Sequence, residues 1–401
     1  MIDIFFVSSL CSKKKYKKIF YTRKEPIITP SQKFFQLIID GMHSTEKVKI
    51  TCMTALPVSS NTFSEKEVKY EKEIIDDRLE FNYLGFKNGK ITRHLSLILN
   101  SSLFFYKWLN ENKNRKVIVL TDCLCWQITI PVQILCYLYK IRKVSFVTDL
   151  PRFSDVKSKY GFIRRHISSW VNSLTELFLK YYDGYIFLTS FMREEINKND
   201  APYIIVESSV DGGTLCEAKP FQTTKYIFMY AGAVCERYGI VDFAEVFEKC
   251  ANKNMELWIF GNGDAVDLIN QKNFKSVIYK GCVSLQEIVE FEKKATVLIN
   301  PRPTTDLYTR FSFPSKTCEY MISGTPVLST RLSGIPHEYN SYIFWFSDCS
   351  KIGYQKGIAS VMKMTHKELY DFGRKAQKFC FVNKNNIKQG TRIVDFISEI
   401  R

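Results

Sequence analysis

The sequence predicts an α/β fold made of two domains with open, mainly parallel sheets. Short apolar runs, each long enough for one buried strand, alternate along the chain with amphipathic stretches at helical spacing. Several of these runs stop at a glycine or a polar turn, as strands do in such sheets. The 401 residues are enough for two domains of ordinary size. Residues 211–224 carry Gly212, Gly213 and Pro220 without periodicity, which predicts the connection between the domains.

In the first domain, apolar runs predict the strands and apolar residues at helical spacing predict the helices. The window 117–139 is the most apolar of the chain, but Asp122 and Pro131 interrupt it, and a carboxylate inside a bilayer is costly. We therefore interpret this window as a strand, a turn and a buried helix, not as a membrane span. The predicted strands are residues 2–7, 48–53, 117–120, 143–148, 185–188 and 203–206, and the predicted helices start after Ser31 and cover residues 95–109, 160–182 and 191–198.

Two basic segments of the first domain each allow two interpretations. Residues 13–18 follow the first strand and are either a solvated loop or a contact for lipid phosphate. The helix at 160–182 has an apolar face that either packs on the core of the domain or lies in a membrane interface. The basic residues that border this face are Arg164, Arg165, His166 and Lys180.

In the second domain, two strands are followed by glycine turns. Gly232 and Ala233 follow the strand at 226–231, and Gly261 and Gly263 follow the strand at 257–260. A glycine at such a turn lets backbone N–H groups approach a diphosphate, although a single Gly-x-Gly is a weak signal. The other predicted strands of this domain are residues 277–280, 295–299, 326–330 and 342–346, and its helices include one from residue 241, residues 284–290 and residues 316–322.

The stretch from Asn300 to Tyr339 carries the most chemistry. It starts at the carboxyl end of a predicted strand, where open α/β sheets bind ligands. The prolines at positions 301, 303 and 314 exclude a helix across the loop, and Ser315 is then expected to cap the helix at 316–322.

Charged residues at the start of this helix predict an anion site. Lys316 lies on the first helical turn, where its charge opposes the helix dipole unless an anion binds there. Arg302 and Arg310 add positive charge to the same loop. Glu319, one turn further along, suits the acceptance of hydrogen bonds from sugar hydroxyls. The alternative is a capped surface helix with an ordinary Glu–Lys pair, but the combination favours a nucleotide-phosphate site.

The signature SFPSKTCEYMISGTPVLSTRLSGIPHEY, residues 312–339, resembles the C-terminal signature of glycosyltransferase family 4, and Asn-Pro-Arg just upstream strengthens the match. The resemblance implies the GT-B fold, with two facing Rossmann-like domains and an active-site cleft between them. It further implies a nucleotide-diphosphate-sugar donor, no metal or other cofactor, and retention at the anomeric carbon. The implied boundaries are a first domain at 1–207, a linker at 208–224, a second domain at 225–384, and a C-terminal helix at 385–401 that packs back on the first domain.

The sequence also departs from the family at three positions. Many members carry a second Glu eight positions before the one that matches Glu319, and Phe311 stands there in this chain. Ala233 and Tyr238 stand where many members carry Arg and Lys, so the phosphate role passes to the neighbouring Arg237.

The resemblance assigns roles to individual residues. Asp149, after the strand at 143–148, is a candidate for acceptor orientation or proton handling, and capping the following loop is its alternative role. Lys316 and Arg302 complete the predicted catalytic set. The predicted donor-binding residues are Gly232, Ala233, Arg237, Gly261, Gly263, Val283, Asn300, Ser315 and Glu319.

Composition limits the compartment and the partners. The twelve cysteines lack paired spacing, and no cleavable signal precedes the first strand, so we expect reduced thiols in the cytoplasm. The net charge of +16 calls for an anionic partner, and without a nucleic-acid-binding motif we expect an anionic membrane surface, not nucleic acid. The predicted function is transfer of a sugar to a glycan or lipid-linked glycan in cell-surface polysaccharide biosynthesis. A nucleotide-sugar epimerase and a non-catalytic nucleotide- or carbohydrate-binding protein are the alternatives.

Overall fold

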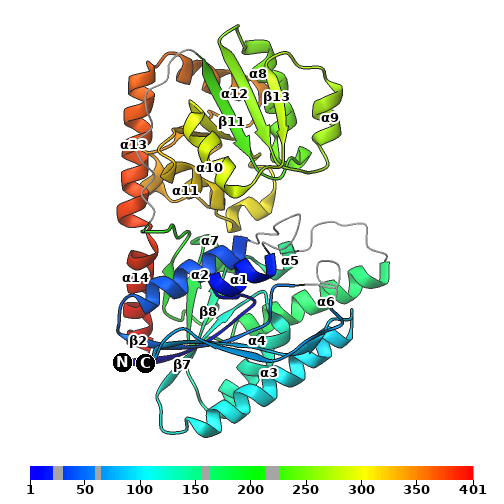
Figure 1. The fold of residues 1–401 in the computed structure, drawn as a ribbon, viewed down its shortest axis with the longest axis vertical. Coiled ribbons are helices and arrows are strands. Elements are labelled where there is room, and N and C mark those ends of the chain that lie inside the picture. The colour runs from blue at the N-terminus through cyan, green and yellow to red at the C-terminus, as the bar shows by residue number, and fades with distance from the viewer. Residues whose placement is uncertain (21–29, 59–64, 155–161, 214–224, 401) are drawn as a thin grey trace. The chain divides into compact units, whose positions relative to one another are not determined.

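A computed structural model describes residues 1–20, 30–58, 65–154, 162–213 and 225–400. The chain divides into two compact units (Figure 1): unit 1 comprises residues 1–209 and 386–401, and unit 2 comprises residues 210–385. Each unit has its own sheet with helices on both faces, so the predicted α/β class with two Rossmann-like domains is confirmed. Residues 214–224 of the predicted linker lie outside the described residues.

Unit 1 is built on a sheet with the strand order β10-β9-β8-β7-β1-β2-β5-β4. Its neighbouring strands are parallel, except for the antiparallel pair β4 and β5. β3 and β6 form a separate antiparallel pair. The strands are β1 (Ile2–Ser8), β2 (Val48–Thr54), β3 (Glu67–Val68), β4 (Glu71–Ile74), β5 (Leu79–Tyr83), β6 (Phe86–Lys87), β7 (Val117–Asp122), β8 (Lys143–Val147), β9 (Gly184–Phe187) and β10 (Tyr203–Ile205).

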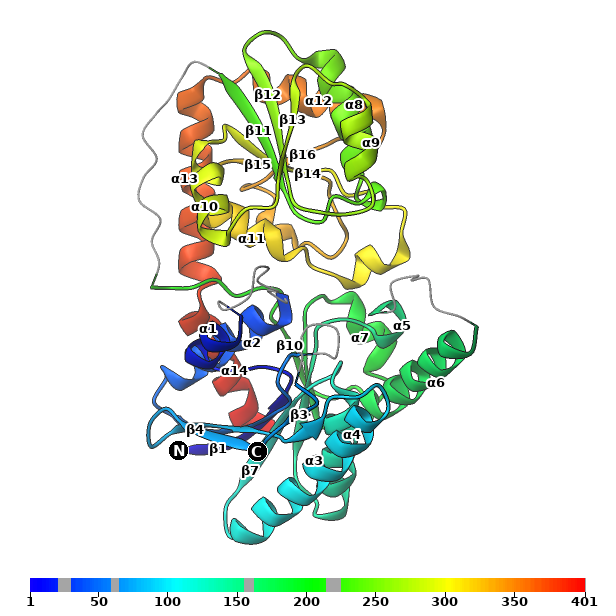
Figure 2. The same ribbon diagram turned by 45° about the vertical axis from the view of Figure 1, so that its right-hand side comes forward.

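The crossover rule explains which helices cover which face of this sheet. The chain moves from β1 through α2 to β2 in one direction, and through α3, α4 and α6 to β7, β8 and β9 in the other. Because such crossovers are right-handed, α2 covers one face and α3, α4 and α6 cover the other, as Figure 2 shows. The last helix, α14, packs against α2. The helices are α1 (Lys13–Phe20), α2 (Pro30–His43), α3 (Thr92–Glu111), α4 (Trp126–Leu138), α5 (Pro151–Ser154), α6 (Phe162–Leu179), α7 (Phe191–Ile196) and α14 (Asn386–Ile400).

Unit 2 has an all-parallel sheet with the order β13-β12-β11-β14-β15-β16. Phe228 and Tyr230 of β11 belong to one buried cluster, and the alternating Met229 and Ala231 belong to the other, so both faces of the sheet are covered. The strands are β11 (Tyr226–Ala231), β12 (Met255–Phe260), β13 (Val277–Gly281), β14 (Val297–Asn300), β15 (Val327–Ser329) and β16 (Phe344–Trp345). The helices are α8 (Ile240–Cys250), α9 (Val266–Gln271), α10 (Leu285–Lys294), α11 (Ser315–Ile322), α12 (Lys351–Met362) and α13 (His366–Asn383), with short 3₁₀ helices η1 (Glu236–Tyr238), η2 (Leu307–Phe311) and η3 (His337–Tyr339).

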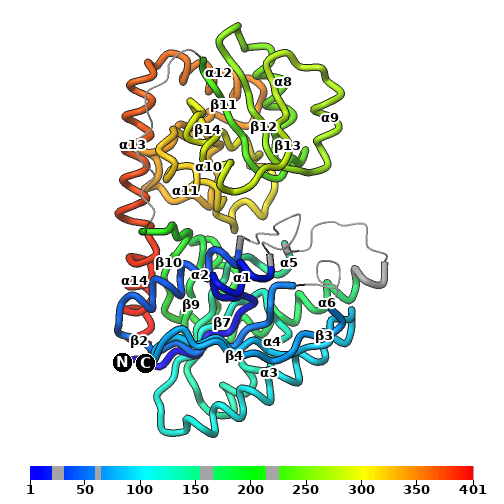
Figure 3. Tube along the Cα trace, viewed as in Figure 1, coloured from blue at the N-terminus to red at the C-terminus, as the bar shows by residue number. Residues whose placement is uncertain are grey.

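The strand order reverses once within each sheet. Figure 3 follows the chain through the two units. In unit 2 the reversal lies between β11 and β14, since β12 and β13 follow on one side and β15 and β16 on the other. In unit 1 it lies between β1 and β7. The connections that leave the two central strands diverge at such a point and leave a crevice at their carboxyl ends, which is where open α/β sheets bind ligands.

Two features of unit 1 differ from the sequence analysis, and a third bears on the two interpretations given there for the helix at 160–182. The basic run at 13–18 lies in the helix α1, not in a loop. The strands between residues 67 and 87 were not predicted. β3 and β6 have two residues each and β4 is mostly exposed, whereas β5 is mostly buried but alternates apolar and polar residues and so forms no continuous apolar run. The outer surface of α6 leaves Ile167, Trp170 and Leu177 exposed, so these residues do not pack on the core. No helix within the described ranges is both long enough and apolar enough to cross a bilayer.

Candidate functional site

The reversal point of unit 2 gathers most of the predicted site residues. Gly232 directly follows β11, and Asn300 is the last residue of β14, the neighbouring strand. The loop that leaves Asn300 leads to the first turn of α11, which carries Lys316. The predicted strand–loop–helix arrangement therefore stands at the position where the topology opens a crevice.

The glycine turns after β11 and β12 are in direct backbone contact. A Cβ atom on Gly261, whose φ is +121°, would lie 1.8 Å from the Gly232 carbonyl oxygen, and one on Gly263 would lie 2.2 Å from the Val234 carbonyl oxygen. Only residues without a side chain allow this approach. Gly232 was expected to supply a backbone donor to the diphosphate, but its N–H donates to the Phe260 carbonyl oxygen at 2.9 Å and is not free.

The space that Gly232 leaves open is occupied by the amine of Lys316. A Cβ atom on Gly232 would lie 2.0 Å from Lys316 Nζ, and Nζ lies 5.5 Å from the centre of the Tyr230 ring. The residue as a whole is only half-buried, but its amine is lodged in the turn and loses most of its hydration. Burial therefore lowers the pKa of Lys316 to about 8, although Glu319 and Glu292 act to raise it. An amine with this pKa gains charge when an anion binds beside it.

The first turn of α11 differs from the prediction in its cap. Pro314 is the N-cap residue, and no side chain caps the helix, so the prediction that Ser315 caps it is wrong. Ser315 is instead the first helical residue and is exposed, and an N–H at this position has no partner within the helix. Glu319 is half-buried one turn further along, near enough to Lys316 to act on its pKa.

Two arginines from separate loops meet at a pair of tyrosines. Arg302 Nε donates to the Tyr308 hydroxyl at 3.1 Å, and the Arg302 guanidinium lies 4.8 Å from the ring centres of both Tyr238 and Tyr308. The Arg237 guanidinium lies 4.7 Å from the Tyr308 ring and 5.5 Å from the Tyr238 ring. The two tyrosine rings thus hold Arg237 and Arg302 in one cluster, and these are two of the cations that the sequence analysis assigned to a diphosphate.

Tyr230 connects this arginine cluster with the lysine. Burial raises the pKa of the Tyr230 hydroxyl most strongly, Tyr238 and Cys235 raise it further, and Arg302 lowers it. The same hydroxyl donates to the Ala233 carbonyl oxygen at 2.8 Å, while Ala233 itself is exposed. Lys316, Arg302 and Arg237 therefore lie against neighbouring tyrosine rings, and Asp306, whose Oδ2 lies 3.9 Å from Arg237 Nη2, offsets part of their charge.

Buried polar atoms without partners mark the floor of the site. Asn300 Nδ2 has no hydrogen-bond partner among the described residues, although the backbone oxygen of Asn300 accepts from the Thr330 N–H at 3.0 Å. The hydroxyls of Thr330 and Thr317 are buried and unpartnered in the same part of the chain. Because a buried donor without a partner is costly, these atoms favour a polar ligand or water there. The sequence analysis named Asn300 but missed both threonines. Thr330 could have been found from its place at the carboxyl end of a strand.

The remaining predicted residues lie apart from this charge cluster. Val283 is half-buried in the loop between β13 and α10, whose helix starts with a capping box of Ser284 and Glu287. Asp149 belongs to unit 1, and its Oδ1 accepts from the Leu150 N–H at 2.9 Å, as expected for a residue that caps a loop.

Sequence reasoning missed the polar pair at the reversal point of unit 1. Ser8 Oγ donates to Asp122 Oδ2 at 2.9 Å, across the ends of the neighbouring strands β1 and β7. Asp122 is 3% exposed, and burial raises its pKa. We found no group of three His, Cys, Asp or Glu side chains that could hold a metal ion within the described ranges.

Comparison with known proteins identifies the domain that holds this site. Residues 225–351 match the family model of the glycosyl transferases group 1. No curated protein matches the chain. Solved structures with the same fold cover both units, which confirms the GT-B architecture.

Three of these structures illustrate the likeness. Sucrose-phosphate synthase from Thermosynechococcus elongatus has a TM-score of 0.68 at 11% identity, covering 100% of this chain and 99% of its own. HepE of Anabaena, solved with UDP, has a TM-score of 0.64 at 9% identity, covering 99% of this chain and 100% of its own. The lipopolysaccharide outer core galactosyltransferase WaaB has a TM-score of 0.61 at 14% identity, covering 99% of both chains. Residues 225–351 thus carry the glycosyltransferase match that the resemblance implied, and the full-length likeness shows the same fold over both units.

Proposed function

We propose that the protein is a glycosyltransferase that takes a sugar from a nucleotide-diphosphate-sugar donor, held by unit 2, and transfers it to a glycan or lipid-linked glycan acceptor. The observation that supports this most directly is the Lys316 amine, which is lodged in the glycine turn at the reversal point of the sheet. A desolvated cation at the N-terminus of a helix, beside unpartnered backbone and side-chain donors, suits a diphosphate.

Each part of the donor has a candidate partner in unit 2. Lys316, Arg302 and Arg237 would neutralise the diphosphate, with the N–H of Ser315 as a further donor. Glu319 would accept hydrogen bonds from the ribose hydroxyls, and the backbone around Val283 would meet the base. The donors on the floor, which are Asn300 Nδ2 and the hydroxyls of Thr317 and Thr330, would bind phosphate or sugar oxygens.

The chemistry follows from these charges. The bond between the anomeric carbon and the diphosphate oxygen breaks, an acceptor hydroxyl oxygen bonds to the carbon, and the hydroxyl proton must be removed. Negative charge grows on the departing nucleoside diphosphate, and cations that are already in place stabilise it more than they stabilise the donor. Asp149 is the candidate for orienting the acceptor or handling its proton. Retention at the anomeric carbon and independence from metal are carried over from the family resemblance.

The acceptor and the location belong to the same proposal. The galactosyltransferase WaaB, whose fold is similar, acts on the lipopolysaccharide outer core by its name, which supports an acceptor of a cell-surface glycan. The net charge of +16 favours contact with an anionic membrane surface. We therefore place the enzyme in the cytoplasm, in peripheral contact with the inner face of the cell membrane.

A thermal-shift titration with UDP, GDP and ADP, first without metal and then with magnesium, tests the donor site. A nucleotide that binds the folded protein raises its melting temperature with concentration, so one of the three should do so without metal. Transfer from the matching sugar nucleotide then separates an enzyme from a mere binding protein. If none of the three stabilises the protein, with or without magnesium, the proposed donor site is refuted.

A further inference from the structure

Unit 1 exposes an apolar surface along the helices α3, α4 and α6, here called the outer helix face. On α3, Leu95, Leu99 and Leu103 are 62%, 58% and 58% exposed, although they belong to a regular helix. More than half of the exposed large hydrophobic residues in the described chain lie on these three helices or directly beside them. The members of this face are Leu95, Leu99, Leu103, Tyr106, Ile134, Tyr137, Leu138, Tyr139, Ile167, Trp170 and Leu177.

Packing within unit 1 does not account for these residues. The opposite side of α3 already packs on the sheet, since Leu97, Phe105 and Leu109 are buried and the Phe105 ring lies 4.7 Å from that of Phe5. A helix that is apolar on both sides normally contacts a second apolar medium. Large exposed apolar patches on soluble proteins commonly mark contacts with proteins or membranes.

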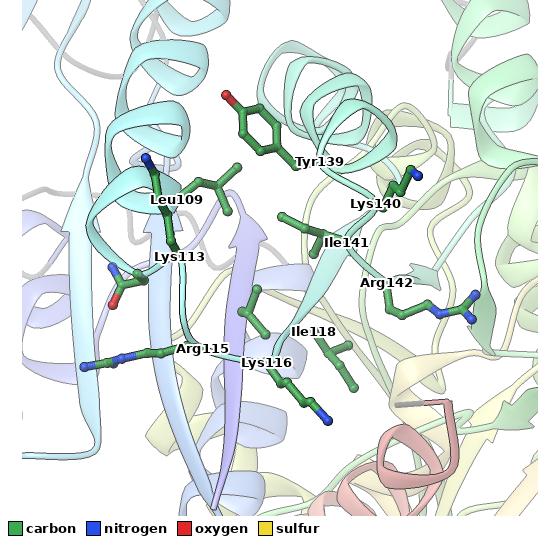
Figure 4. Close-up of a pocket in the computed structure, with 11 residues that line it drawn as sticks. Leu109, Lys113, Arg115, Lys116, Ile118, Tyr139, Lys140, Ile141 and Arg142 are labelled. Atoms are coloured by element: carbon green, nitrogen blue, oxygen red, sulfur yellow. The ribbon is translucent and has the colours of Figure 1, made fainter.

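A basic pocket adjoins this face at the C-terminal ends of α3 and α4 (Figure 4). It has a volume of about 680 Å³, and Tyr139, which lines it, lies 6.3 Å from Tyr106 of the outer helix face. Figure 4 shows Leu109, Ile118 and Ile141 at its centre and basic side chains around it. The five cations that line it are Lys113, Arg115, Lys116, Lys140 and Arg142, and its lining contains no acidic residue.

The lysines of this pocket are available for an outside partner. Arg115 and Arg142 are paired with Asp3 and Asp183, at 3.7 and 3.0 Å. Within the described part of the chain, no ion pair is formed by the three lysines, which are Lys113, Lys116 and Lys140.

The three helices themselves carry little negative charge. α4 contains no charged residue, and α3 and α6 contain one acidic residue each. These two are already close to cations: Glu111 lies 3.8 Å from Lys107, and Glu176 lies 3.3 Å from Arg152. The outer helix face and its pocket thus combine apolar side chains with uncompensated positive charge.

We propose that the outer helix face docks on an anionic lipid bilayer, with its leucines and aromatic residues in the interface and the three pocket lysines on phosphate headgroups. The charge distribution selects this partner over a second copy of the chain, because a symmetric dimer would place these lysines against the same face of the other copy, whose two acidic side chains already lie close to cations. Aromatic and leucine side chains next to lysines are the composition of interfacial helices. This inference locates the membrane contact of the proposed function, but its test needs no sugar transfer.

Flotation of the full-length protein with vesicles tests the proposal. The protein should float with phosphatidylcholine vesicles that contain about 30% phosphatidylglycerol, bind less in high salt, and stay largely unbound with pure phosphatidylcholine. Two variants separate the two parts of the surface: Leu99→Ser with Leu103→Ser, and Lys113→Gln with Lys116→Gln and Lys140→Gln. These side chains are exposed or line an open pocket, so both variants should keep the melting temperature of the wild type.

The expected losses are large. Removal of three lysines should weaken vesicle binding by about a hundredfold, and removal of the two leucines by about tenfold or more. A matched control takes the same charge from exposed lysines of unit 2, with Lys253→Gln, Lys363→Gln and Lys367→Gln, and should bind nearly as well as the wild type.

Three outcomes would overturn the proposal. The first is that the wild type does not float with anionic vesicles. The second is that the unit 2 control loses as much vesicle binding as the pocket variant. The third is that the leucine variant binds vesicles like the wild type and differs from it only in molecular mass in solution. The last outcome would assign the face to a second copy of the chain. Nucleotide binding by the same samples is measured by thermal shift. It tests the proposed function, whereas flotation tests the membrane contact, so either proposal can fail without the other.

Discussion

The reversal points of the two sheets offer the same opening and are filled in opposite ways. In unit 1, Ser8 and Asp122 close the gap between β1 and β7 with a buried hydrogen bond of 2.9 Å. In unit 2, the corresponding residue after β11 is Gly232, and Asn300 at the end of β14 leaves its buried Nδ2 without a partner among the described residues.

The side chains, and not the topology, therefore decide which crevice is left for a ligand. A carboxylate that accepts from its neighbours needs nothing from outside, and it repels a phosphate. A glycine turn with a desolvated amine beside it is incomplete without an anion. We expect the donor in unit 2 for this reason, and the following predictions would break or sharpen the contrast.

Replacement of Lys316 by Ala should have the largest effect. We expect the rate of transfer at saturating donor to fall by about 100- to 1,000-fold, because a preorganised cation next to the leaving group is lost. The melting temperature should not fall, since the amine is desolvated and forms no ion pair among the residues in the described ranges. Initial-rate kinetics measure this, with the exposed Lys253→Ala as control. Full activity of Lys316→Ala would remove the phosphate assignment.

Gly232→Ala should come next, because its Cβ would overlap Lys316 Nζ and lie 3.2 Å from the Tyr230 hydroxyl. The amine must then leave the turn, and we expect turnover to fall by about 10- to 100-fold through misplacement alone. In the Lys316→Ala background the same substitution should cost little more, since the two residues act as one unit. Equal losses in both backgrounds would show that Gly232 acts on something other than the lysine.

The pH dependence of diphosphate binding should follow the protonation of the Lys316 amine. With the Lys316 pKa near 8, the free enzyme loses this charge above that pH, so UDP or its equivalent should bind more weakly as pH rises from 7 to 9. The decrease should approach about tenfold per pH unit at most. Lys316→Met should bind weakly and show a flatter profile, as calorimetric titration can measure. A wild-type profile as flat as that of the variant would contradict the assignment.

The stability of the folded protein should increase with pH, whereas diphosphate binding weakens. The pKa of Lys316 is about 8 when folded and near the usual 10.5 when unfolded, so between these values the unfolded state binds more protons. The free energy of unfolding of the ligand-free protein should therefore increase as pH rises through this window, because the cost of burying the Lys316 charge disappears. The stability gained by Lys316→Met over the wild type should accordingly be larger at pH 7 than at pH 10.

Asp122→Asn should have the smallest effect on transfer and on stability, if the Ser8–Asp122 pair fills the crevice of unit 1 without a ligand. The amide can still accept from Ser8, so the free energy of unfolding should stay within about 1 kcal/mol, whereas Asp122→Ala should lose about 1–3 kcal/mol. Because burial raises the pKa of Asp122, its contribution to stability falls as pH rises through that pKa, and Asn should abolish this slope. Denaturant unfolding measures both effects. A large loss of transfer by a stable Asp122→Asn would show that this crevice also serves the reaction.

The places of the predicted site residues of unit 2 within the fold could be found from the sequence because their signals are local. Gly232, Lys316 and Asn300 each stand at a strand or helix end, which apolar runs and prolines locate without tertiary information. The role of Gly232 was misjudged, because whether its N–H is free depends on Phe260, a residue of another strand. Ser315 likewise looked like a cap, but Pro314 holds that position in the folded helix.

Tertiary pairings explain what was missed in unit 1. Ser8 and Asp122 are 114 positions apart, and only the neighbouring strands β1 and β7 bring them together. Only the α6 part of the outer helix face was considered in the sequence analysis, for a related reason: periodicity shows that a helix is amphipathic, but not that both of its sides are apolar and one is left uncovered. α3 and α6 illustrate this, since their exposed leucines and tryptophan have the spacing of core residues.

The return of α14 to unit 1 has a consequence for how the protein is made. A Cβ atom on Gly41 of α2 would lie 1.9 Å from the Asn386 carbonyl oxygen, and one on Gly390 would lie 2.1 Å from the Gly41 carbonyl carbon, so the two helices touch backbone to backbone. The ribosome synthesises α2 before unit 2 and α14 after it. Unit 1 therefore waits with part of its core uncovered while unit 2 can already fold. Chaperones that recognise exposed apolar surface should bind the nascent chain through α2 until α14 has been synthesised.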